Sequence, residues 1–189
     1  MPFLAAGAQM SDSVPKKQLA AAQGIEAGCI LFHINTATAD ILRMAREARM
    51  PSHYLEGSGA NIFCQEWRAF VHAVVTAGLM QHAPNSVLMA YLRQTRNLLA
   101  AAGGQPEADA LPGPLSPDSF VDGPFSRYMA LLAQARQAEC PDMFCQRMAD
   151  AAPLAGHPDA QAKARLAAMM AMLISAVWDK LEQYDILPE

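Results

Sequence analysis

The feature that most constrains the fold of this chain is the apolar run LAAMMAMLISAVW, from Leu166 to Trp178, in which Ser175 is the one polar residue. The run is shorter than the roughly 20 apolar residues that a bilayer-spanning helix needs, and charged residues flank both of its ends. We therefore expect no membrane span. A helix that is apolar on nearly every side has to be covered from several directions, so we interpret the run as part of a helical core.

Two apolar stripes run along this expected helix. The first keeps the alternating four-and-three spacing of one helix face and comprises Leu166, Met170, Leu173, Val177, Leu181 and Tyr184. The second lies beside it and comprises Met169, Met172 and Ala176. The run is either the central helix of a bundle, which we favour, or a bundle helix whose second stripe is left for a partner. Met side chains suit both roles because they adapt to irregular surfaces.

Composition indicates an all-α protein. Apolar residues make up 52% of the 189 residues, which is ample for a core, and they are mainly Ala, Leu and Met, which favour helices over strands. We expect a bundle of five or six helices, mostly antiparallel. Residues 15–189 are interpreted as one helical domain, and residues 1–14 as a flexible N-terminus.

Apolar periodicity and turn residues place the expected helices along the chain. Residues 29–34, CILFHI, could also form a short strand, but no partner strand is evident and a helix is favoured. GSGAN at 57–61 is expected to be a loop. Residues 103–124 hold five prolines and four glycines and form an internal loop, lid or tether. The expected helices are 16–49 (as one helix or two), 61–82, 86–101, 125–139, 141–152 and 158–184.

Charge and cysteine usage narrow the class of protein. The net charge of −4 argues against nucleic-acid binding through bulk charge, and the spaced arginines of 43–49 and 93–96 are interpreted as solvated. The N-terminus lacks the basic segment of a secretory signal, so we expect a cytoplasmic protein with four reduced cysteines. Export by a route without a cleaved signal remains an alternative that would use residues 1–14.

The sequence contains no motif that names a reaction. CxxC, HExxH and ExxH spacings are absent, and no metal or cofactor is expected. Cys140 is the candidate reactive thiol, because it stands at an expected helix N-terminus that would lower the thiol pKa; a buried Cys140 is the alternative. His72 is expected on a solvated helix face, and His33 in the core.

These patterns favour a non-enzymatic interaction protein that binds a protein partner or a second copy through an apolar face. The candidate contact residues are Met169, Met172, Phe120 and Phe125. One alternative is a helical bundle that binds a small molecule or uses a thiol, with a pocket lined by His33, Cys64, Trp67 and Tyr91. Another alternative is a secretion effector or its chaperone.

Overall fold

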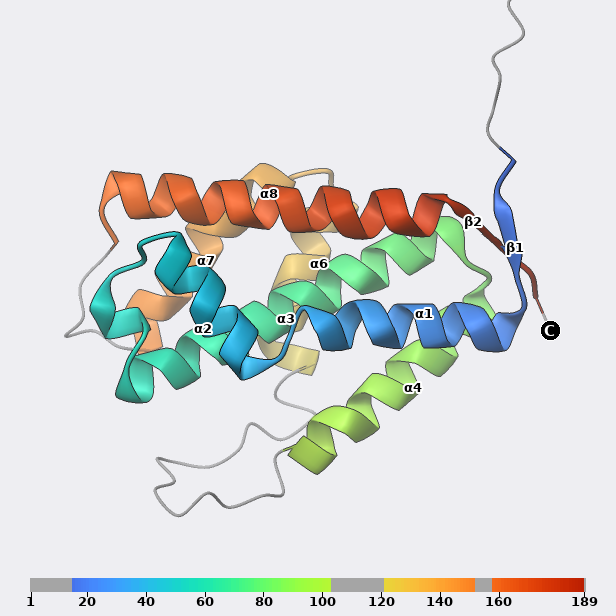
Figure 1. Cartoon of the computed structure of the whole chain (residues 1–189), viewed down its shortest axis with the longest axis horizontal. Helices are drawn as coiled ribbons and strands as arrows, with labels where there is room; N and C mark the ends of the chain where they lie inside the picture. The colour runs from blue at the N-terminus through green and yellow to red at the C-terminus, as the bar shows by residue number, and fades with distance from the viewer. Residues whose placement is uncertain (1–14, 103–120, 152–157, 189) are drawn as a thin grey trace, which may run out of the picture.

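The computed structural model describes residues 15–102, 121–151 and 158–188, and most of them are helical (Figure 1). The all-α class is confirmed, with seven α-helices among the described residues. The elements in chain order are β1 (Lys17–Leu19), α1 (Ala21–Ile34), α2 (Thr38–Glu47), the 3-10 turn η1 (Ser52–Tyr54), α3 (Gly57–His82), α4 (Asn85–Ala102), the π-helical turn η2 (Val121–Phe125), α6 (Ser126–Ala133), the 3-10 turn η3 (Gln137–Glu139), α7 (Cys140–Ala151), α8 (Ala160–Glu182) and β2 (Tyr184–Ile186).

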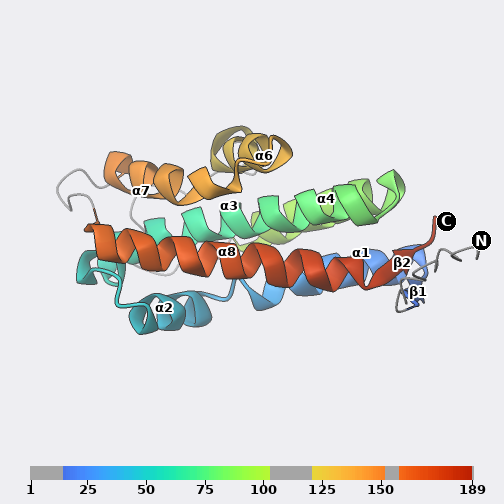
Figure 2. The same cartoon turned by 90° about the horizontal axis from the view of Figure 1, so that it is seen from above.

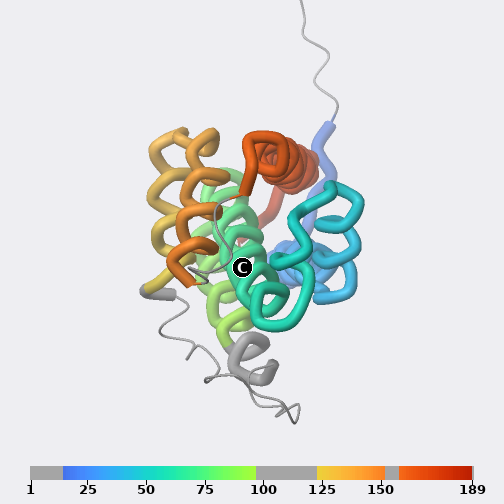
Figure 3. Tube along the Cα trace, turned by 90° about the vertical axis from the view of Figure 1, so that its left-hand side faces the viewer, coloured from blue at the N-terminus to red at the C-terminus, as the bar shows by residue number. Residues whose placement is uncertain are grey.

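The centre of the molecule is α3, which contacts α1, α2, α4, α6, α7 and α8. Figure 3, seen nearly along the bundle, shows the other helices arranged around it. Every residue from Ala69 to Leu79 is buried, His72 and Thr76 included, because other helices surround this stretch. The central position that we favoured for the run at 166–178 therefore belongs to α3.

The helices around α3 form layers. Figure 2 shows α6 and α7 on one side of α3, with α1 and α2 on the other. α8 packs along α3 and runs in the same direction (Figure 1), so the mostly antiparallel arrangement is not confirmed. Asp159 caps the start of α8 by accepting a hydrogen bond from the Ala162 amide at 2.6 Å, consistent with the helix start expected near this residue.

Close approach between α3 and α8 depends on Gly78. A Cβ at this position would lie 2.7 Å from Leu181 Cδ1 and 3.0 Å from Trp178 Cδ1. The Trp178 indole N–H donates to the Val74 carbonyl at 3.0 Å, which fixes the orientation of α8 over α3. These contacts fix one side of α8 against α3.

The long helical region expected at 16–49 divides into α1 and α2 at Asn35 and Thr36. The Thr36 hydroxyl donates to the Phe32 carbonyl at 2.8 Å, and the Trp67 indole donates to the Asn35 carbonyl at 3.2 Å. These bonds satisfy carbonyl groups at the end of α1 and hold the break against α3. Residues 29–34 are helical, so the helix interpretation of CILFHI is confirmed.

Three local predictions were wrong. Residues 17–19, which we expected in a helix, form strand β1 and pair in parallel with β2, which starts at the last residue of the helix expected at 158–184; Leu19 aligns with Ile186. GSGAN is the first turn of α3, where a Cβ on Gly59 would lie 1.8 Å from the His53 carbonyl oxygen. The helix expected at 125–139 ends at Ala133, after which Ala135 adopts a positive φ of 55°. Of the expected loop at 103–124, residues 103–120 lie outside the described part.

Candidate interaction surface

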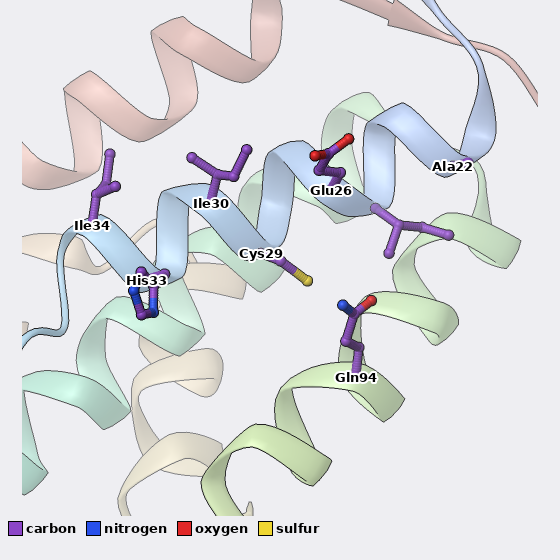
Figure 4. A pocket seen from close by; sticks show the side chains of 8 residues that line it. Ala22, Glu26, Cys29, Ile30, His33, Ile34 and Gln94 are labelled. Atoms are coloured by element: carbon purple, nitrogen blue, oxygen red, sulfur yellow. The ribbon is translucent and has the colours of Figure 1, made fainter. Parts of the chain in front are cut away.

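Three large apolar side chains are exposed on neighbouring helices. Ile30 and Ile34 of α1 are 51% and 58% exposed, and Met172 of α8 is 66% exposed. Figure 1 shows α8 and α1 running lengthwise one above the other, and Figure 4 shows Ile30 and Ile34 projecting from α1 on the side of α8. Together with the exposed Ala168 and Ala176 of α8, these residues define what we call the α1–α8 face.

The α8 part of this face lacks charge over three turns. The side that packs inward contains Leu166, Met170, Val177 and Leu181. No acidic or basic residue occurs between Arg165 and Asp179, although the outward side of a surface helix usually carries such residues. The apolar run found in the sequence is therefore covered on its α3 side and open on the opposite side.

The structure separates the four candidate contact residues. Met172 belongs to the α1–α8 face, whereas Met169 is only 8% exposed and is a core residue. Phe125 is half-buried, with its ring centroid 4.6 Å from that of His72, and so lies in a different part of the molecule. Phe120 lies outside the described residues.

The four residues predicted to line a pocket do not lie together around one groove. Cys64, Trp67 and Tyr91 are buried side chains of the closed core. His33, which we expected in the core, is exposed and lines a shallow surface groove of about 690 Å³ between α1 and α4 (Figure 4). The groove is lined by Ala22, Ile25, Glu26, Cys29, Ile30, His33, Ile34 and Gln94.

His72 is buried rather than solvated. Its Nε2 lies 2.8 Å from the Thr95 hydroxyl, and its ring packs between those of Tyr91 and Phe125. Burial lowers the pKa of His72 to about 4. Thr76, four residues further along α3, is also buried and donates to the His72 carbonyl at 2.7 Å. Both polar side chains are therefore paired inside the bundle.

The environment of Cys140 argues against the hypothesis that its thiol is reactive. This side chain is fully buried, and burial raises its pKa to about 11, the opposite direction from the helix-terminus effect that we expected. Cys64 and Cys145 are also buried, and burial raises the pKa of each thiol. Cys29, half-buried in the groove beside α4, is the most accessible of the four cysteines.

Sequence reasoning missed a buried carboxylate. Glu66 of α3 is 5% exposed and accepts hydrogen bonds from the Tyr128 hydroxyl and the Arg147 Nε, each at 2.7 Å. Burial raises the pKa of Glu66 above its usual value, and the two hydrogen bonds oppose that shift. The network joins α3 to α6 and α7. One signal was present, because Glu66 lies between Phe63 and Phe70 on an apolar stripe.

Two further properties of the described part of the chain concern metal binding and the crossing of a membrane. Across residues 15–102, 121–151 and 158–188, no group of three or more His, Cys, Asp or Glu side chains is placed to hold a metal ion. α8 is long and apolar enough to cross a membrane by length and composition, with 39% of its most apolar window buried. One such helix is weak evidence, because core helices of soluble proteins have the same properties.

Comparisons with known proteins add no family. No protein-family model matches the sequence, and neither the curated proteins nor the solved structures give a significant match.

Proposed function

We propose that this protein is a helical interaction module that binds an apolar helix of a protein partner on its α1–α8 face. The observation that carries the proposal is the exposure of Ile30 and Ile34 of α1 and of Met172 of α8, each more than half exposed. Adjacent apolar side chains on a surface without charges are typical of protein-binding sites. An amphipathic helix is the element that fits beside two such helices.

The expected gain from covering this face is modest but useful. Full burial of an Ile or Met side chain contributes about 1.5–3 kcal/mol, so completing the burial of three half-exposed side chains contributes a few kcal/mol before the cost of association. This range suits a specific contact of moderate affinity rather than a permanent one. Small neighbours such as Ala168 and Ala176 let a partner helix approach closely.

The small-molecule and thiol alternative has less support. Three of the four residues expected to line its pocket are in the closed core, and the groove that contains His33 is a shallow surface feature. The thiol that was expected to react, Cys140, is buried and its pKa is raised. The effector alternative depends on residues 1–14, which lie outside the described part.

A photo-cross-linking amino acid placed at position 172 tests the proposal in cells. We expect covalent adducts from position 172 and none from position 89, where Met89 is 47% exposed on α4 and provides a matched control. Replacing Ile34 by Lys should remove the adducts, because a charge on the neighbouring helix would disrupt the same face. Equal adducts from both positions, or none from position 172, would contradict the proposal.

A further inference from the structure

We infer that the α1–α8 face is self-complementary and that its occupant is α8 of a second copy of this chain, packed antiparallel about a two-fold axis at Met172. This inference rests on the proposed function and names the partner at the same surface. It depends on the order of residues along α8 and on their exposure.

The residues of α8 are arranged symmetrically about Met172. Arg165 lies seven positions before Met172 and Asp179 seven positions after it, and Ala168 and Ala176 lie four positions away on either side. Seven residues make almost two helical turns, and four residues make slightly more than one. These five residues therefore form one stripe along one side of α8.

Antiparallel pairing brings opposite charges together at both ends of this stripe. With the two-fold axis at Met172, Arg165 faces Asp179 of the second copy, and the same contact recurs at the other end. Parallel pairing would place like charges opposite each other, which is unfavourable. A two-fold interface uses the same patch on both chains, so this charge order suits a second copy of α8.

The contacts within one chain leave the side chains of Arg165 and Asp179 accessible to a second copy. Asp179 is exposed and accepts from the Ser175 hydroxyl at 3.1 Å. Arg165 donates to the Arg49 carbonyl at 3.2 Å, and within the described ranges neither residue forms an ion pair. Each charge can therefore form an ion pair across the interface without breaking one within its own chain.

The neighbouring side chains favour close packing of the two helices. Ala168 would face Ala176 of the second copy on either side of the axis, and small residues there allow helix axes to approach to roughly 8 Å. Two contacts mark the flanks of α8. On one flank Arg165 donates to the carbonyl of Arg49, just after α2, and on the other Lys163 pairs with Asp142 of α7. Met172 lies two turns from Arg165 on the α2 flank, where Ile30 and Ile34 of α1 would contact the second copy.

A charge exchange tested by sedimentation velocity separates this arrangement from other modes of association. Arg165→Glu and Asp179→Arg each place like charges at both ends of the paired helices. Each should weaken the dimer about tenfold, because two attractive charge contacts are replaced by two repulsive ones. The double variant Arg165→Glu/Asp179→Arg restores opposite charges and should dimerise like the wild type.

Two controls keep the result interpretable. Asp150→Arg makes the same charge change at an exposed position on α7 and should leave the dimer unchanged. Circular dichroism melting shows whether each variant is folded, and a double variant that is folded but remains as weak as the single variants overturns the inference. A wild-type chain that stays monomeric at all concentrations also overturns it. If position 172 still gives adducts to another protein, the proposed function survives and only self-pairing fails; if it gives none, both fail.

Discussion

His72 couples the stability of the bundle to pH. Its pKa is about 4 in the folded chain, against about 6.5 in an unfolded one, so the unfolded state binds more protons between these values. Stability is then complete above pH 6.5 and falls as the pH drops towards 4, by up to about 3 kcal/mol. Urea unfolding at several pH values measures this loss.

A His72→Gln variant isolates the contribution of the imidazole. The comparison is needed because the raised pKa of Glu66 acts in the opposite direction, contributing stability that is lost as the pH rises. We expect the variant to lose much of the pH dependence between 6.5 and 4 while remaining helical. An unchanged pH dependence in His72→Gln would show that the imidazole is not buried as neutral in the folded chain.

Cys29 should be the first thiol to react with an alkylating reagent under native conditions. It is half-buried in the surface groove, whereas Cys64, Cys140 and Cys145 are buried. Mass spectrometry of the labelled protein should locate the first label at Cys29, and a Cys29→Ser variant should lose the fast phase. Faster labelling of Cys140 would revive the reactive-thiol hypothesis based on the sequence.

The two histidines show why side-chain environments were only partly predictable. Periodicity placed His72 on the polar side of its helix, but that helix is surrounded, so its polar side is buried as well. The partner of His72 is Thr95, which lies on another helix and cannot be identified from local spacing. His33, among apolar neighbours in the sequence, is exposed because α1 leaves one side open.

The attachment of α6 and α7 to α3 depends on the Glu66 network. Glu66→Gln removes the charge that pairs with Arg147 and should reduce the free energy of unfolding by about 1–3 kcal/mol, because a buried group is then imperfectly paired. Glu139→Gln, at an exposed ion pair with Arg136, should leave the free energy of unfolding nearly unchanged and is the matched control. Chemical denaturation compares the two; equal losses would contradict a stabilising role for the network.

The helices were largely predictable, and the other elements were not. Four-and-three apolar spacing and N-capping residues such as Asp159 mark helices within a local window, and α3, α4, α7 and α8 appear close to the expected ranges. The β1–β2 pair joins residues 17–19 to 184–186, so no local pattern reveals it. The sequence around Gly57 and Gly59 indicated a loop, because the helical role of Gly59 depends on its contact with η1, which is not a feature of the local pattern.

At the level of the complete chain, α3 takes the central position that the sequence suggested for the helix at 166–178, and α8 lies at the surface. Both are long and apolar, but α3 has the polar side chains of Glu66, His72 and Thr76 paired inside the bundle, whereas α8 retains a wide uncharged side that faces outward. Apolar composition indicated that both helices contribute to the core, but it could not show which of them lies at the centre. The open side of α8, together with the exposed Ile30 and Ile34 of α1, is the surface on which the proposed second chain would bind.

Disulfide formation at position 172 tests this account most directly. In a Cys29→Ser background, Met172→Cys places two thiols beside the proposed two-fold axis, where their Cα atoms would be within the roughly 7 Å that a disulfide spans. Mild oxidation should convert this variant to a covalent dimer on a non-reducing gel, while Met89→Cys in the same background remains monomeric. Cross-linking of Met172→Cys no faster than that of Met89→Cys would contradict antiparallel pairing of α8.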